Sequence, residues 1–165
     1  MIRVRQAERT RVPSRCAARD DAHVRVRGTT GRVVDARRHA ESLGVRWIDG
    51  DYDHTEWLKK VEGLEGEPER GCRCLQCFKI RLAAAAQEAK RLGIKYFTTT
   101  LASSRWKSIE QITAAGMAAQ EAVEGTVFWA QNWRKDGLSD RRNQLLKEYG
   151  FYNQQYCGCE FSMRK

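Results

Sequence analysis

The sequence predicts an α/β protein with a parallel sheet covered by helices on both faces. Short β-branched and aromatic runs alternate with longer runs of helix formers, and no repeat interrupts this alternation. A length of 165 residues with 41% hydrophobic content suits one domain with a single core. Residues 1–34 are rich in arginine, lack lysine and show no sustained periodicity, so we separate them from an ordered domain over residues 35–165.

The ordered domain is predicted to begin with a helix and a strand. The run DARRHAESLG favours a short helix that stops at Gly44, and VRWID then alternates apolar and polar side chains as a strand does. Asp51 and Asp53 follow in an acidic turn. We interpret them as turn and helix-cap residues; the alternative is a role in binding metal or substrate.

Two helices and a loop follow. HTEWLKKVEGL predicts a helix with Trp57, Leu58 and Val61 on one face, and EGLEGEPERG, with its glycines and proline, predicts a loop. After Cys77, the run FKIRLAAAAQEAKRLG contains strong helix formers and predicts a helix that ends at Gly93.

The second half repeats the alternation. IKYFTTTLAS and TVFWA predict buried strands, and the helix between them begins where Ser108 and Gln111 fit a capping box. Ser139 is the predicted N-cap of a last helix that stops at Gly150.

Polar and basic side chains follow the predicted strands. Ligands collect at the carboxyl ends of parallel strands, so we expect a binding edge there. The residues concerned are Thr99, Thr100, Ser103, Ser104, Lys107, Arg134 and Lys135. Three of them, Lys107, Arg134 and Lys135, are candidates for phosphate contacts.

Two cysteine pairs carry the strongest chemical signal. Cys74 and Cys77 form a C-x-x-C immediately before a predicted helix, whose N-terminus favours thiolate over thiol. Cys157 and Cys159 form a C-x-C near the end of the chain. Four thiols saturate one tetrahedral zinc or one cubane iron–sulfur cluster. Alternatively, the first pair binds the metal, and the second is a redox pair or binds a second metal. Cys16 is interpreted as incidental.

Charge and hydropathy limit the partners. A formal net charge of +9 predicts a polyanionic partner, with RNA or DNA as the natural candidate, although a basic solvated surface is the alternative. No apolar run reaches the roughly 18 residues that a membrane span needs, and the N-terminus lacks a signal-peptide core. We therefore expect a cytoplasmic protein with no membrane partner. A reducing compartment favours metal binding or catalysis by the paired thiols.

A family resemblance covers the chain from about Asp35 to its end. The matching motifs are GDYDHTEW, EGEPERGCRCLQCFKIRL, YFTTTLASSRWKS, RKDG and FYNQQYCGCEFS. In their order and spacing the chain resembles the epoxyqueuosine reductases of the QueH type. The resemblance implies a Rossmann-like domain that reduces epoxyqueuosine to queuosine in the anticodon loop of tRNA, the last step of queuosine biosynthesis.

The resemblance also implies the cofactor and the site residues. Cys74 and Cys77 match ligands of a 4Fe-4S cluster, and Cys157 and Cys159 match a redox-active pair near the metal, where a second mononuclear iron is conceivable. The partners implied are tRNA carrying epoxyqueuosine and an electron donor that the sequence does not identify.

The N-terminus departs from the family pattern. The family has a strand running into a Cys-Cys motif there, whereas Cys16 is the only cysteine before Cys72, so the first strand is degenerate or missing. We hypothesise that residues 1–34 are a divergent or frame-shifted form of that segment, which resequencing the source gene would test. Half of the expected ligands are then absent, and we expect impaired activity, with Cys72 as a candidate substitute ligand. The competing class is a non-catalytic RNA-binding module with one structural zinc held by all four paired thiols.

Overall fold

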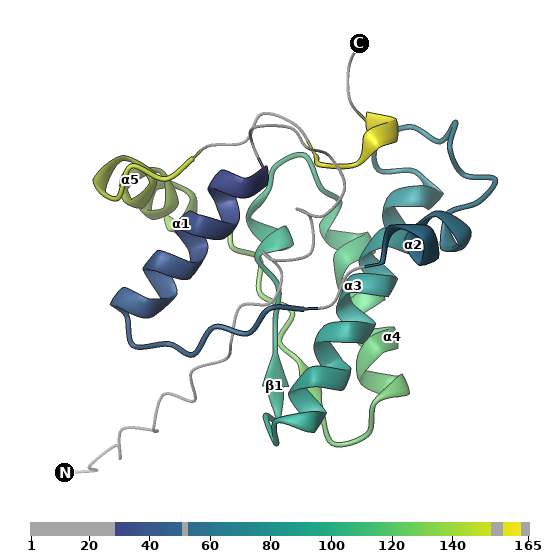
Figure 1. Cartoon of the computed structure of the whole chain (residues 1–165), viewed down its shortest axis with the longest axis horizontal. Coiled ribbons are helices and arrows are strands. Elements are labelled where there is room, and N and C mark those ends of the chain that lie inside the picture. The colour runs from purple at the N-terminus through teal and green to yellow at the C-terminus, as the bar shows by residue number, and fades with distance from the viewer. Residues whose placement is uncertain (1–28, 51–52, 153–156, 163–165) are drawn as a thin grey trace.

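Figure 1 shows the computed structural model of the chain, which describes residues 29–50, 53–152 and 157–162. Its elements confirm the α/β prediction, with a parallel sheet that has two strands in the described residues. In chain order they are α1 (Thr29–Ser42), α2 (His54–Lys60), α3 (Cys72–Arg91), β1 (Tyr96–Phe97), the 3-10 helix η1 (Thr100–Ser103), α4 (Ile109–Ala122), β2 (Val127–Phe128), α5 (Leu138–Glu148) and the 3-10 helix η2 (Glu160–Ser162). No described helix is long and apolar enough to cross a membrane.

The two strands form a β1–α4–β2 unit. They run parallel, with Tyr96 opposite Val127 and Phe97 opposite Phe128, so the chain must cross over between them, and α4 makes that connection. Backbone hydrogen bonds from Val127 N to Lys95 O (2.7 Å) and from Trp129 N to Phe97 O (2.8 Å) hold the pair. Both predicted strands are therefore real, but each is much shorter than its β-branched run.

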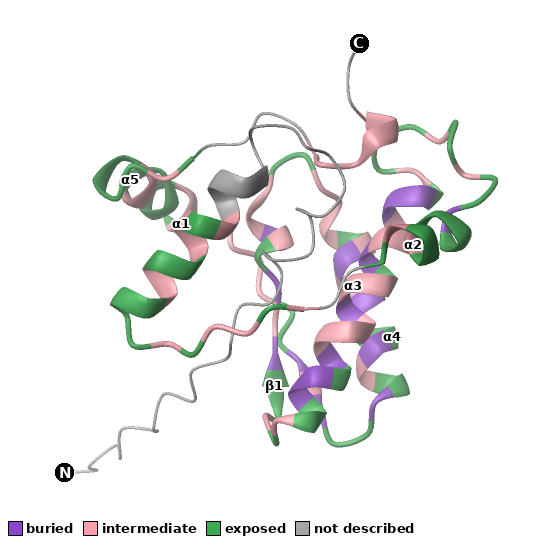
Figure 2. Cartoon of the chain, in the orientation of Figure 1, coloured by how far each residue is buried: buried purple, intermediate pink, exposed green. Residues whose placement is uncertain are grey.

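The core lies between these strands and helices α3 and α4. Both helices pack on the sheet and on each other, and their buried faces appear in purple in Figure 2. In Figure 1, α1 and α5 lie to the left of β1, and α3 and α4 lie to its right. The buried apolar cluster consists of Cys74, Phe78, Leu82, Ala86, Ala89, Phe97, Ala102, Ile112, Ala115, Ala119, Val123 and Phe128.

Helix α3 begins earlier than its sequence pattern indicates. It starts at Cys72, so Cys74 and Cys77 lie inside its first two turns, and the prediction that they precede the helix was wrong. Its end was predicted correctly. Gly93 has φ 67°, and hydrogen bonds from Gly93 N to Lys90 O and from Ile94 N to Ala89 O close a Schellman motif.

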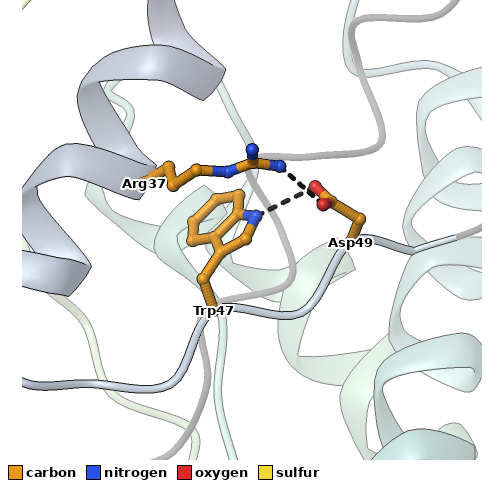
Figure 3. A network of polar contacts seen from close by, with 3 residues as sticks. All are labelled: Arg37, Trp47 and Asp49. Carbon is orange, nitrogen blue, oxygen red and sulfur yellow. Dashed lines mark hydrogen bonds and ion pairs between the residues drawn. The ribbon is translucent and has the colours of Figure 1, made fainter.

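The segment after α1 differs from its prediction. Helix α1 stops as expected before Gly44, which has φ 63°. Residues 45–50 form no strand, because no described strand offers their backbone a partner. Figure 3 shows how their side chains are used instead: Asp49 accepts from Arg37 Nη2 at 2.5 Å and from Trp47 Nε1 at 2.9 Å.

These two hydrogen bonds predict an acid-sensitive contact. The bond from Trp47, followed by that from Arg37, lowers the pKa of Asp49 below its ordinary value of 3.8. A carboxylate with a lowered pKa stabilises the fold above its unfolded pKa and loses that contribution as the pH falls. We expect the indole N–H resonance of Trp47 to shift as the pH falls below about 4, and not to shift in Asp49→Asn.

Trp133 provides the internal control for this titration. Its Nε1 donates to Thr99 O, a carbonyl that does not titrate. Its indole resonance should stay constant over the same range. A Trp47 shift that survives in Asp49→Asn would contradict the assignment.

Two of the three predicted helix caps are confirmed. Ser108 is the N-cap of α4, and its Oγ accepts from Gln111 N at 3.1 Å. Ser139 is not the N-cap of α5, because Gly137 takes that position with φ 75° and Ser139 lies in the first turn, donating to Arg134 O. Asp53 caps α2, as expected, by accepting from Glu56 N. Asp51 lies outside the described residues.

Candidate functional site

The first cysteine pair lies at the amino end of α3. Cys74 is buried, and Cys77, one helical turn further on, is half-buried. The sulfur of Cys74 accepts a hydrogen bond from Arg70 N at 3.3 Å. Because α3 begins at Cys72, Cys74 also lies in the first turn of the helix, near the positive end of the helix dipole.

Arg70 adopts a backbone conformation that a residue with a side chain seldom takes. Its φ is 70°, in the left-handed region, which costs about 1 kcal/mol or more for a residue other than glycine. The side chain holds this conformation by donating from Nε to Trp106 O (3.1 Å) and from Nη2 to Arg105 O (3.0 Å). Gln111 Nε2 donates to Arg70 O at 2.8 Å. The loop before α4 thus aims the Arg70 N–H at Cys74.

The second cysteine pair lies in the segment that leads to η2. Cys157 and Cys159 are both half-buried free thiols. Gly158 between them has φ 57°, and the Cys159 N–H donates to Cys157 O across it. This tight turn brings the two cysteines together, as expected for a C-x-C with a central glycine.

Lys107 contacts the second cysteine pair. Its Nζ donates to Cys157 Sγ at 2.6 Å. Burial lowers the pKa of Lys107, but the charge and hydrogen bond of Cys157 and the charges of Cys74 and Glu69 outweigh burial and raise it overall. The Lys107 ammonium therefore contacts Cys157 and lies within electrostatic range of Cys74. No three Cys, His, Asp or Glu side chains of the described residues converge, so a centre shared by the two cysteine pairs stays a prediction.

Arg73 fastens the C-terminal segment to the same helix. The residue is 2% exposed, and its Nη1 donates to Leu64 O (3.0 Å) and Glu65 O (2.6 Å). Its Nη2 lies 3.4 Å from Ser162 Oγ, and its guanidinium carbon lies 5.3 Å from the Phe161 ring centre. The Phe161 ring also stacks on Trp57 of α2. Both rings and the guanidinium thus hold η2 next to α3.

The sequence reasoning missed Arg70 and Arg73, and it assigned Gln111 to a capping box, whereas the Gln111 side chain donates to Arg70 O. Arg73 stands between two cysteines, and this position was the only available signal of its importance. Nothing local marks Arg70 or this use of Gln111, because these contacts join residues 35 to 41 positions apart.

The site suits a negatively charged sulfur centre, but it supplies only part of a ligand set. The Lys107 ammonium contacts the Cys157 sulfur, the Arg70 backbone N–H contacts the Cys74 sulfur, and among the described residues no carboxylate pairs with Arg73. Cys74 and Cys77 fit two of the four ligand positions of a 4Fe-4S cluster. Within the same described ranges, no group of three or more Cys, His, Asp or Glu side chains converges to hold a metal ion. The remaining two ligand positions of a cluster are therefore unfilled by the part of the chain described.

The other candidate residues line the predicted edge of the sheet. The segments after β1 and β2 are hydrogen-bonded together through Thr98 Oγ1 to Trp129 O and Trp133 Nε1 to Thr99 O. Arg134 donates to Ala102 O and to Lys107 O, so its guanidinium supports the loop that carries Lys107. Lys135 is exposed. Their role as phosphate contacts stays a prediction. Cys16 lies outside the described residues, and Cys72 is exposed.

Comparison with known proteins agrees with this arrangement. Residues 26–165 match the family model described as epoxyqueuosine reductase QueH. The chain is similar to epoxyqueuosine reductase QueH of Histophilus somni, with 46% identity over 127 residues, and to the Haemophilus influenzae protein of the same name, with 43% identity. Each alignment covers 77% of this chain and 52% of the relative.

The Acinetobacter baylyi relative carries the same name. It is 42% identical over 127 residues, covering 77% of this chain and 58% of its own length. This chain thus spans a little over half the length of these relatives. On the family match and these identities, the chain belongs to the epoxyqueuosine reductase QueH family.

Proposed function

We propose that this chain reduces epoxyqueuosine to queuosine in the anticodon loop of tRNA. Family membership supports the reaction. The observation that assigns the reaction to particular residues is the contact of Lys107 with Cys157, within electrostatic range of Cys74. A reductive deoxygenation can use two thiol pairs, one of them at a helix N-terminus, together with a nearby cation.

The C-terminal cysteine pair supplies the two electrons that the proposed reduction needs. Cys157 and Cys159 give up two electrons and two protons and become a disulfide. The two C–O bonds of the epoxide break, a carbon–carbon double bond forms, and the oxygen leaves as water. A separate electron donor then reduces the disulfide again. Lys107 holds Cys157 by a charge-assisted hydrogen bond, which orients its sulfur.

Cys74 and Cys77 are the residues that would hold an iron–sulfur cluster. When bound, such a group supplies single electrons and a Lewis-acidic iron. The Arg70 N–H at 3.3 Å from the Cys74 sulfur is the kind of contact that tunes a thiolate ligand. Because two ligand positions are unfilled in the described residues, we assign no reaction step to the cluster.

The test is a single-turnover assay under anaerobic conditions on tRNA bearing epoxyqueuosine. Iron and sulfide are measured on the same reconstituted protein. The wild-type chain should form queuosine, and Cys157→Ser and Cys159→Ser should abolish product because a single thiol cannot form the disulfide. Cys74→Ser should lose bound iron together with activity.

A matched pair of lysine variants tests whether Lys107 acts through its contact with Cys157 or only through the general positive charge of the surface. We expect Lys107→Met to slow turnover about tenfold or more, since a charge-assisted hydrogen bond is worth about 1.5–3 kcal/mol. Lys79→Met, on the exposed face of α3, should leave turnover unchanged. Unimpaired product formation by Cys157→Ser would overturn the proposed step.

The structural-zinc alternative is not favoured. It needs four thiols around one metal, but no such group converges among the residues that the structure describes. In addition, the Lys107 ammonium contacts the Cys157 sulfur, where the metal would have to approach.

A further inference from the structure

An exposed tryptophan adjoins the cysteine site. Trp106 is 58% exposed, the largest exposed fraction among the described large hydrophobic residues. The Arg105 guanidinium carbon lies 4.8 Å from its ring centre. Most of the indole stays open to solvent with this cation in place.

The loop that carries Trp106 is fixed by the site itself. Arg70, which positions Cys74, donates to the carbonyls of Arg105 and Trp106. Ser104 Oγ accepts from Trp106 N (3.4 Å), and Ser104 O accepts from Lys107 N (3.2 Å). The backbone of this loop is therefore already held in place before a ligand binds to the ring, which reduces the entropy cost of binding.

The next residue in the chain reaches the reactive thiols. Lys107 contacts Cys157, and consecutive Cα atoms lie about 3.8 Å apart. Trp106 thus lies in the same short loop as the side chain that contacts Cys157.

We propose that Trp106 and Arg105 form a stacking platform for an unpaired base of the RNA substrate, next to the base that is reduced. The inference rests on the proposed function for the identity of the ligand as RNA. Aromatic rings and arginine planes are the surfaces on which unpaired bases stack, and the guanidinium adds attraction to the phosphate backbone. The net charge of +9 suits the same partner.

The chain contains a matched control pair. Tyr96 is 49% exposed, and Lys95 Nζ lies 5.4 Å from its ring centre, so it too is an exposed aromatic beside a cation. Tyr96 begins β1, whereas the Trp106 loop follows the carboxyl end of that strand. Tyr96 is thus at the opposite end of the strand from the proposed binding edge.

The experiment measures binding of the full chain to a synthetic anticodon stem-loop hairpin by fluorescence anisotropy. Trp106→Ala should weaken binding about tenfold, as expected for loss of one base–aromatic stack, and Trp106→Phe should restore most of the affinity. Tyr96→Ala should bind as the wild type does. The dependence of log Kd on log salt should be the same for Trp106→Ala and wild type, because stacking releases no counterions. A fully paired RNA duplex should not distinguish the two proteins.

Two outcomes would overturn the platform: equal losses in Trp106→Ala and Tyr96→Ala, or no loss in Trp106→Ala. The single-turnover assay separates this result from the proposed function. Hairpin binding that depends on Trp106, without queuosine formation, supports the platform and contradicts the reductase activity. Queuosine formation with unchanged binding by Trp106→Ala supports the activity and contradicts the platform.

Discussion

Arg73→Met is expected to lower the free energy of unfolding by about 3 kcal/mol, because charged hydrogen bonds contribute about 1.5–3 kcal/mol each and their acceptors are left unpaired. The guanidinium is 2% exposed and donates to two backbone carbonyls of the loop before α3. Methionine fills similar space but offers no donor. Urea denaturation followed by circular dichroism measures the loss.

The same substitution should also release the second cysteine pair. Arg73 contacts Phe161 and Ser162, which directly follow the C-x-C. In Arg73→Met, Cys157 and Cys159 should react severalfold faster with iodoacetamide, as mapped by peptide mass spectrometry. Buried Cys74 should stay protected, which distinguishes release of the C-terminal segment from global unfolding.

Two further arginine variants make this prediction specific. Arg73→Lys keeps a cation beside Phe161 and one set of donors, so it should retain part of the protection. Arg91→Met is the control on the same helix, because the Arg91 side chain is 64% exposed and pairs with the buried Glu88 at the opposite end of α3 from Arg73. Unchanged reactivity of Cys157 and Cys159 in Arg73→Met would show that Arg73 does not hold the segment.

Gly116→Ala is expected to destabilise the fold by about 2 kcal/mol, since overpacking a core costs about 1–3 kcal/mol. Helix propensity alone predicts the opposite sign, because alanine is about 1 kcal/mol more favourable than glycine inside a helix. In the structure, a Cβ at Gly116 would lie far inside the contact distance of the Phe128 ring atoms Cδ1 and Cε1. That ring is 6% exposed and packs 5.3 Å from Phe97, so it has little room to move.

Thermal denaturation of Gly116→Ala measures this effect, and Met117→Ala provides the control. Met117 is the next residue of α4, but it is 40% exposed, so its truncation should change stability little. A double variant, Gly116→Ala with Phe128→Leu, should recover part of the loss because leucine frees the space that the new methyl group needs. Stabilisation by Gly116→Ala alone would mean that α4 does not approach the sheet this closely.

The sequence predicted correctly those helix ends and caps that depend on residues within one turn of the chain. The stops at Gly44, Gly93 and Gly150 were correct, because all three adopt positive φ, which glycine accepts at little cost. The cap at Ser108 was correct for a similar reason, since it depends on a residue three positions away. The strand at residues 45–49 was wrong, because a strand needs a partner that the alternation of side chains does not reveal.

Patterns in the amino-acid sequence were enough to predict the α/β class, most helix ends and the motifs that identify the family. The contacts that hold the cysteine pairs in place could not be read from local patterns: Lys107 and Cys157 are 50 residues apart in the chain, and Arg73 and Ser162 are 89 apart. The tertiary structure also decided that Arg70 takes a left-handed conformation and that Gly116 lies against Phe128. The physical reason is that propensities and caps act within a turn or two of chain, whereas these contacts exist only once the core has packed.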